Sequence, residues 1–275
     1  MLFMKPETES LRVAFILAHP DDEHIPFGLP AQLVMQGHEV SLIALTKGDL
    51  GSHITTSRRK IAGIRKKEFK ESARILGVDA QIVQFHDGEL SHQSKKAGRR
   101  LLKELRMQKP NLVVIPSSTD YHLDHVETHD IAQWAIFNLP AQPFVTRRGF
   151  FRRKVPAYTH PVAVYEMDTQ GSQTWKSVTQ DSGDNHDTLS SVNTILPISL
   201  AAIEKSILAF QAHKSQLGSR ENGQLSYPEL ARLGARRRGM QAGFSYGVGL
   251  NFIPFGGYAF STKNLLSPPE RQVGL

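Results

Sequence analysis

Short apolar segments alternate with longer amphipathic ones along the first half of the chain, and this alternation limits the possible folds more than any other feature. The apolar segments are predicted as strands, at residues 12–18, 39–45, 80–85 and 111–116. The segments between and after them are predicted as helices, at residues 28–36, 57–76, 94–108 and about 125–138. Gly37, Gly77 and Pro140 follow three of these segments and are typical of helix ends.

Apolar strands that alternate with helices predict a parallel sheet covered by helices on both faces. We therefore expect an α/β fold, a Rossmann-like and mostly parallel sheet extended by a C-terminal segment. The 275 residues are expected to form a single domain. Residues 1–140 would be its α/β core, and residues 141–275 would complete and elaborate it.

The second half of the chain is less regular. Residues 160–167 are interpreted as a fifth strand, and about 199–214 as a helix. Residues 175–191 are predicted to be an exposed loop because they are polar and contain glycine. The stretch 242–260 is rich in glycine and aromatic residues, and its pattern predicts no single element.

The chain contains no cysteine, which excludes disulfides, thiol nucleophiles and cysteine-type zinc sites. A metal ion would have to be held by histidine and carboxylate groups. The N-terminal ten residues do not resemble a signal peptide, and no apolar stretch is long enough to span a membrane. We therefore expect a cytoplasmic protein without a membrane span.

The net charge of +7 raises the question of an anionic partner. The basic residues of the helix 57–76 share one face, as expected for a solvated helix surface. They are Arg59, Lys60, Lys66, Lys67, Lys70 and Arg74. No nucleic-acid-binding motif accompanies them, so we expect no nucleic-acid partner and some attraction for an anionic substrate.

Two clusters of histidine and carboxylate residues follow predicted strands. The first strand ends in "AHPDDEH" (residues 18–24), and the fourth ends in "PSSTDYHLDHVETHD" (residues 116–130). Ligands of open parallel sheets bind at the carboxyl ends of the strands, and the first and fourth strands are often neighbours. The first strand–helix loop lacks the Gly-x-Gly-x-x-Gly pattern of dinucleotide-binding proteins. The two clusters therefore favour a metal site over a nucleotide site.

The motifs "AHPDDE" (18–23) and "HLDH" (122–125), in this order, resemble those of the PIG-L (LmbE-like) de-N-acetylases. "LTKGDLGS" (45–52), "RKKEFKESARILGV" (65–78) and, more weakly, "AHKSQ" (212–216) are also similar to segments of that family. The resemblance covers about 11–130, is weaker near 200–217 and is absent from 140–195. It implies a zinc enzyme that removes acetyl groups from N-acetylglucosamine conjugates.

Carried over residue by residue, the resemblance assigns a single zinc ion to His19, Asp22 and His125. It implies that Asp21 is the general base and that His122 stabilises the oxyanion or protonates the leaving amine. Asp124 would orient His122. Leu123 replaces the family's proline without affecting a ligand. His122 and His129 are alternative ligands within a helical turn of His125, and His129 is otherwise expected at the surface or behind the site.

Arg65 and Glu68 fall on the apolar side of the helix 57–76, where unpaired charges are uncommon. Arg65 either binds substrate or forms a buried structural pair with Glu68. Asp87, in "FHDGEL", either binds a sugar hydroxyl or belongs to an ordinary Asp-Gly turn. Glu23 and His24 are expected at the helix start or in solvent.

The predicted function is zinc-dependent hydrolysis of the acetamide of a small acetylated amino sugar, by a metal-activated water. Two alternatives remain open. One is a two-metal phosphoesterase, and the other is a non-catalytic sugar- or partner-binding protein. The second is favoured by Val248, which replaces an acidic residue common near the end of family members. A homo-oligomer is compatible with the resemblance.

Overall fold

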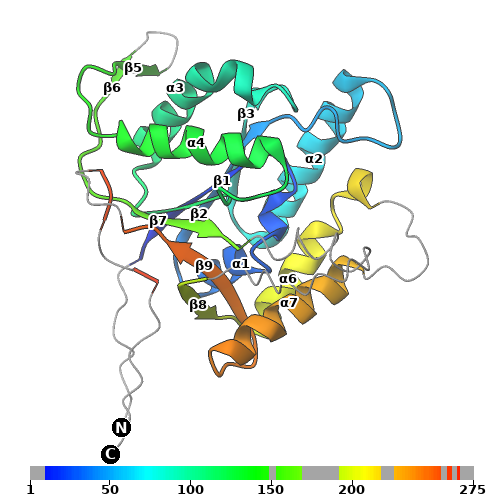
Figure 1. Ribbon diagram of the computed structural model, residues 1–275. Coiled ribbons are helices and arrows are strands. Elements are labelled where there is room, and N and C mark those ends of the chain that lie inside the picture. The colour runs from blue at the N-terminus through cyan, green and yellow to red at the C-terminus, as the bar shows by residue number, and fades with distance from the viewer. Residues whose placement is uncertain are drawn as a thin grey trace, which may run out of the picture.

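The computed structural model describes residues 10–148, 153–168, 192–217, 226–254, 259–261 and 265–266. A twisted seven-stranded sheet runs through the described part of the molecule, with helices on both of its faces (Figure 1). Its strands are β1 (Arg12–Leu17), β2 (Glu39–Thr46), β3 (Asp79–Phe85), β4 (Leu112–Ile115), β7 (Ala163–Met167), β8 (Thr194–Pro197) and β9 (Gly247–Phe252). A separate hairpin pairs β5 (Thr146–Arg148) with β6 (Arg153–Val155). The predicted α/β class is confirmed.

The order of strands in the sheet is β3-β2-β1-β4-β7-β9-β8. The first five of these strands run parallel, and β9 is antiparallel to both of its neighbours. β1 and β4 are adjacent, as expected, so the loops that follow them leave the same edge of the sheet. Strands from the segment 141–275 extend the same sheet, and the single domain stays a prediction.

The helices are α1 (Leu29–Met35), α2 (Arg58–Leu76), α3 (Leu90–Gln108), α4 (Leu123–Phe137), α6 (Leu200–Phe210) and α7 (Tyr227–Gln241). Two short 3₁₀ helices are η1 (Asp22–His24) and η2 (Lys214–Gln216). Helix α2 matches its prediction because both of its ends carry clear signals. The side chain of Ser57 accepts a hydrogen bond from the Lys60 amide, and Gly77 adopts the left-handed conformation.

Alternating side chains of the strands enter two separate cores. Val13, Phe15 and Leu17 of β1 face one core, which is closed by α1, α2, α6 and α7. Ala14 and Ile16 face the other core, which α3 and α4 cover. Because both faces are buried, β1 is apolar at almost every position, as the sequence shows.

In the second half, β7 confirms the predicted fifth strand. The predicted helix 199–214 divides into α6 and η2. Helix α7 and strands β8 and β9 were not predicted, and the predicted loop 175–191 lies outside the described residues. Within the described part of the chain, no helix combines the length and apolar character that a membrane crossing needs.

Candidate metal-dependent active site

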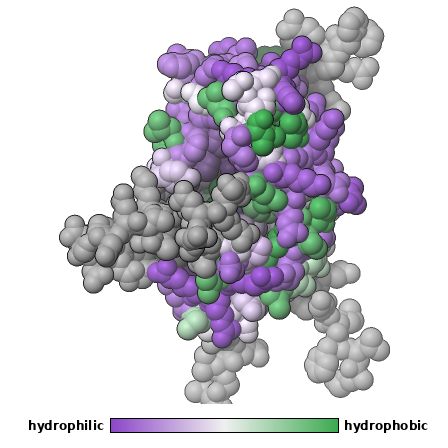
Figure 2. Space-filling model, turned by 90° about the vertical axis from the view of Figure 1, so that its right-hand side faces the viewer, coloured by the Kyte–Doolittle hydropathy of each residue, from purple (hydrophilic) through white to green (hydrophobic). Residues whose placement is uncertain are grey.

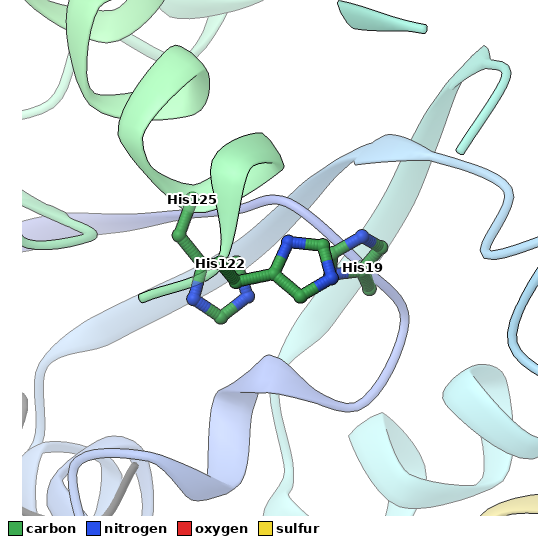
Figure 3. Close-up of side chains that lie close together, drawn as sticks. All are labelled: His19, His122 and His125. Atoms are coloured by element: carbon green, nitrogen blue, oxygen red, sulfur yellow. The ribbon is translucent and has the colours of Figure 1, made fainter. Parts of the chain in front are cut away.

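The loops that follow β1 and β4 bring the two histidine- and aspartate-rich clusters together. His19 lies directly after β1, while His122 caps the start of α4 and His125 lies in its first turn. Figure 3 shows the three imidazole rings gathered at one point. The ring centroid of His19 lies 4.7 Å from that of His122 and 5.3 Å from that of His125. The expected meeting of the two clusters is therefore observed.

Asp22 lies between His19 and His125. Its Oδ2 atom is 3.5 Å from Nδ1 of His19 and 3.3 Å from Nε2 of His125. The backbone amide of His19 also donates to Oδ2, at 2.8 Å, which fixes the orientation of the carboxylate. All three side chains are buried.

Two distances among these donors suit a zinc ion. Among the described residues, two close groups of possible metal ligands join His19 with His122 and His125, and His19 with Asp87 and Asp124. Two ligand atoms about 2.1 Å from a tetrahedral zinc are separated by about 3.4 Å, close to both distances at Asp22. The pKa shifts of His19 and His125 also agree with a bound cation. Burial alone would lower the pKa of each imidazole, but Asp22 and neighbouring carboxylates outweigh it. They raise the pKa of His19 well above its usual value and that of His125 to about 10. The surroundings thus favour positive charge, which a divalent cation supplies while displacing protons.

Asp120 orients His125, and sequence reasoning missed it. The Oδ2 atom of Asp120 lies 2.9 Å from Nδ1 of His125, and its Oδ1 accepts from the amide of His122 at 2.9 Å. An Nδ1–H that donates to Asp120 leaves Nε2 of His125 as the lone-pair nitrogen facing Asp22. The sequence signal that could have identified Asp120 is its position five residues before His125, in the same polar cluster.

Asp124 and Asp87 both contact the other nitrogen of His19, which differs from the expected roles. Nε2 of His19 lies 3.1 Å from Oδ1 of Asp87 and 3.4 Å from Oδ2 of Asp124. Among the described contacts, the Asp124 carboxylate accepts from the amide of Gly88 and makes no hydrogen bond with the His122 ring. The Asp124 carboxylate therefore does not make the expected contact with the His122 ring, because it faces His19 and Gly88. The backbone amide of Asp124 contacts that ring instead. Asp87 also accepts from the amide of Leu50, so both of its oxygens are engaged within the protein.

His122 carries its proton on the nitrogen that faces away from the helix. The backbone amide of Asp124 donates to Nδ1 of His122 at 3.2 Å, so Nδ1 is the acceptor and Nε2 carries the hydrogen. Burial and the nearby His19 and His125 lower the pKa of His122. The half-buried ring is therefore neutral near pH 7 and presents an N–H donor.

Arg65 is buried against Asp21 rather than Glu68. Its Nη2 atom donates to Oδ1 of Asp21 and, at 3.2 Å, to the carbonyl of Pro20. Nη1 donates to the carbonyl of Gly48. Glu68 instead accepts from the amide and hydroxyl of Ser215, so the predicted structural Arg65–Glu68 pair is wrong. Burial raises the pKa of Asp21, and Arg65 opposes this rise.

The loop after β2 makes room for Arg65. A Cβ atom on Gly48 or Gly51 would lie 2.5 Å from the guanidinium group of Arg65. Gly48 also has a φ of +60°, which side-chain-bearing residues rarely adopt. The glycines of "LTKGDLGS" therefore allow the backbone to close over the arginine.

A pocket of about 340 Å³ opens onto these groups. Its lining includes the charged and imidazole groups His19, Asp21, Asp22, Arg65, Asp87, His122 and His125. The rest of the lining is formed by His24, Ile25, Phe27, Gly51, Tyr121, Phe210, Gln216, Tyr227 and Leu230. The ring centroids of Phe210 and Tyr227 lie 4.1 Å apart. The volume lies within the range of about 300–1,000 Å³ that is usual for ligand sites.

Other predicted residues lie beside the site. Glu23 is 2% exposed, so the solvent interpretation is wrong for it, whereas His24 is half-buried and lines the pocket. His129 is buried too, and its Nδ1 lies 3.0 Å from the carbonyl of Pro116. Val248 is buried in β9 and does not line the pocket.

Solved structures share the whole architecture. The N,N'-diacetylchitobiose deacetylase from Pyrococcus horikoshii superposes with a TM-score of 0.70 at 24% identity, covering 90% of this chain and 86% of that chain. The 4-carboxy-2-hydroxymuconate hydratase from Pseudomonas putida KT2440 gives a TM-score of 0.65 at 21% identity, covering 88% and 96%. These likenesses show the fold, which carries more than one chemistry.

Sequence relatives match mainly the first half. The mycothiol S-conjugate amidase of Streptomyces coelicolor is 28% identical over 153 residues, which are 46% of this chain and 52% of that protein. The 1D-myo-inositol 2-acetamido-2-deoxy-alpha-D-glucopyranoside deacetylase of Corynebacterium glutamicum (strain R) is 28% identical over 159 residues, which are 48% and 55%. The chain thus spans about half the length of these relatives. Residues 14–136 match the family described as PIG-L: GlcNAc-PI de-N-acetylase. This match covers less than half of the chain and agrees with the resemblance that its motifs predicted.

Proposed function

We propose that the protein is a zinc-dependent hydrolase that removes the acetyl group from an N-acetylated amino sugar. The observation that carries this proposal is the convergence of His19, Asp22 and His125 in one pocket, with Asp21 beside them. The names of the relatives, a deacetylase and an amidase, support hydrolysis of an amide.

His19, Asp22 and His125 would hold the zinc ion. When bound, zinc lowers the pKa of a water molecule and polarises a carbonyl oxygen. The two imidazoles are oriented for this task by carboxylates on their far nitrogens, Asp87 and Asp124 for His19 and Asp120 for His125. Such partners fix the ring orientation and the tautomer of a ligand histidine.

Asp21 accepts the proton of the attacking water. Its carboxylate lines the pocket beside Asp22, and Arg65 holds one of its oxygens. Burial raises its pKa, as suits a general base, and Arg65 opposes this rise. The proton then passes to the amine nitrogen as the C–N bond breaks.

His122 donates a hydrogen bond from Nε2–H to the amide oxygen as negative charge develops on it. The amide of Asp124 fixes the required tautomer, and the lowered pKa keeps the ring neutral. Arg65 is committed to Asp21 and two carbonyls, so we propose that it acts on substrate through Asp21.

The apolar and aromatic residues that line the pocket would receive the part of the substrate that does not react. Phe210 and Tyr227 offer ring faces on which the apolar face of a sugar or its aglycone can pack. Gln216 stands among them as a neutral hydrogen-bonding group. We therefore propose a small acetylated amino sugar with a neutral group on its far side.

A phosphoesterase is the second candidate, because the possible metal ligands form two groups that share His19: one with His122 and His125, the other with Asp87 and Asp124. Two-metal sites have ions about 3.5–4 Å apart. Metal analysis separates the candidates, since the deacetylase requires one zinc per chain.

The test is acetate release from a panel of N-acetylated sugars with zinc present, including free, methyl and aryl glycosides of N-acetylglucosamine. We expect release from at least one of them and no phosphate release from sugar phosphates. A folded, zinc-loaded chain that releases acetate from none would refute the proposal and favour the non-catalytic binder.

A further inference from the structure

The late motif, residues 212–216, supplies Gln216 to the pocket, whereas the proposed function assigns no role to His213. His213 lies three residues after the end of α6 and directly before η2, and its side chain is fully buried. It faces Glu23, which is the third of the consecutive acidic residues Asp21, Asp22 and Glu23. Neither Glu23 nor His213 lines the pocket.

Glu23 is anchored by two residues that are not among the proposed metal ligands. Its Oε1 atom lies 2.6 Å from Nε2 of His213 and accepts a hydrogen bond from the hydroxyl of Ser72. Ser72 lies on α2, on the face that also carries Arg65, because residues seven apart occupy the same side of a helix. The β1 loop is thus attached to α2 twice, once through Asp21 and once through Glu23.

The Glu23–His213 contact is a buried charge pair. Burial lowers the pKa of His213, but Glu23 and Asp21 outweigh it and raise that pKa overall. Oε2 of Glu23 and Nδ1 of His213 have no hydrogen-bond partner among the described residues. A buried pair with unsatisfied atoms adds little to stability compared with apolar residues of the same size.

The rest of the motif fastens His213 to the same surroundings. The amide and hydroxyl of Ser215 donate to Glu68 of α2, at 2.8 and 2.6 Å. Nε2 of Gln216 donates to the carbonyl of Gly51 at 3.1 Å, in the loop that encloses Arg65. The motif therefore contacts three parts of the site: the β1 loop, α2 and the loop after β2.

We propose that His213 and Glu23 form a positioning pair that sets the direction of the β1 loop, so that Asp22 faces the zinc ligands and Asp21 faces the pocket. The peptide from Asp21 to Glu23 leads into η1, and the amide of Ile25 donates to the carbonyl of Asp22. Rotation of Glu23 out of its anchor would turn the neighbouring Asp22 away from His19 and His125. This role rests on the proposed zinc site, although not on the identity of the substrate.

The decisive variant replaces both charges with apolar groups, Glu23→Leu with His213→Leu. Replacing a buried pair in this way often preserves or improves stability, so a purely structural role predicts a normal protein. A positioning role predicts that zinc affinity falls about 10–100-fold in the folded double variant, as for other residues that orient ligands. His213→Gln keeps a donor near Nε2 and should retain zinc affinity within about threefold.

Zinc affinity is measured by competition with a chromogenic chelator, without substrate, and thermal unfolding is recorded for each variant. Asp168→Asn is the control, because it disturbs another buried pair, in which Asp168 Oδ2 lies 2.7 Å from Nε of Arg238. It should lower stability and leave zinc affinity unchanged. Glu23→Leu alone is measured in parallel and decides the question if the double variant does not fold. If the folded Leu variants bind zinc as tightly as the parent does, the positioning role is overturned. If the parent releases no acetate, the proposed deacetylase function is refuted, but the comparison of zinc affinities still tests the positioning role.

Discussion

Asp21, Asp22 and Glu23 are adjacent in the chain, yet each carboxylate lies in a different environment. Asp21 contacts Arg65 at the pocket wall, and Asp22 lies between two imidazoles. Glu23 faces His213 in the interior. Because environment sets the protonation and reach of a carboxylate, three residues of similar chemistry acquire three roles.

The substitutions Asp21→Asn and Asp22→Asn should distinguish the general base from the zinc ligand. Asparagine has nearly the size of aspartate but cannot take up the proton, so Asp21→Asn should keep zinc and lose about 10²–10⁴-fold in turnover. Asp22→Asn should weaken zinc binding, and added zinc should partly restore activity. Metal content and acetate-release rate are measured for both variants. Near-parental turnover in zinc-loaded Asp21→Asn would remove Asp21 from the mechanism.

Asp120→Asn should reduce zinc affinity about 10–100-fold, since an amide can present an N–H to His125 and favour the wrong tautomer. Asp130→Asn is the control, an exposed aspartate of α4, the helix that carries His125, and it should bind zinc as the parent does. Isothermal titration of the metal-free proteins gives both affinities. Equal affinities in the two variants would show that Asp120 does not orient His125.

The sequence predicted which residues meet, because strand order and motif spacing bring them to one edge of the sheet. It did not predict the direction of each carboxylate. Asp120, Asp124 and Asp87 are all acidic residues in loops, and only the course of the backbone decides which imidazole each one contacts. Glu23 was misjudged for the same reason, since its partner His213 lies 190 residues away in the chain.

At the scale of elements, the loop after β2 depends on glycine to accommodate Arg65. Gly51→Ala places a methyl group 2.5 Å from Nη1 of Arg65 and should displace the guanidinium group from Asp21. We expect turnover to fall about 10–100-fold while zinc is retained. Gly63→Ala is the control, because nothing lies within 4 Å of its added Cβ. It should leave turnover unchanged and raise the free energy of unfolding by about 0.5–1 kcal/mol. Parental turnover in Gly51→Ala would contradict the role of this loop.

Asp49 joins three elements at the rim of the site. It accepts hydrogen bonds from Arg58 of α2, from His86 and from the amide of Asp87. Burial raises its pKa, but these donors outweigh it and hold that pKa below the usual value. A lowered pKa contributes stability that is complete above the unfolded pKa and is lost as the pH falls through the folded pKa. Below about pH 4, the parent should therefore lose part of its stability advantage over Asp49→Asn. Urea unfolding at pH 6 and pH 3.5 measures this change, and an unchanged difference would contradict it.

The helices and strands of the first half were predictable because apolar residues follow a different spacing along buried parallel strands and along amphipathic helices. Helix α7 was missed although its capping box, Ser226 with Glu229, is visible in the sequence. The last strands were harder to recognise. Gly247 and Gly249 interrupt β9, and added Cβ atoms there would lie 3.0 Å from Gly239 N and 2.8 Å from Asp168 Oδ2, respectively.

At the scale of the whole molecule, the surface agrees with the charge analysis. The basic residues predicted on the outer face of α2 are all exposed: Arg59, Lys60, Lys66, Lys67, Lys70 and Arg74. Figure 2 shows that the side of the molecule to the right in Figure 1 is largely hydrophilic, with smaller hydrophobic groups between. The lack of a nucleic-acid partner, the cytoplasmic location and the oligomeric state stay predictions.

The fold places the proposed chemistry where the carboxyl ends of parallel strands meet and where α6 and α7 supply the far wall of the pocket. The central claim is that zinc in this pocket makes the chain a deacetylase. The most direct test is to remove metal from the protein, return zinc in steps, and record acetate release from the panel of N-acetylated sugars. The account predicts no release without metal and a rate that rises in proportion to zinc up to one ion per chain. Equal release with and without zinc, or no release with one zinc bound, would contradict it.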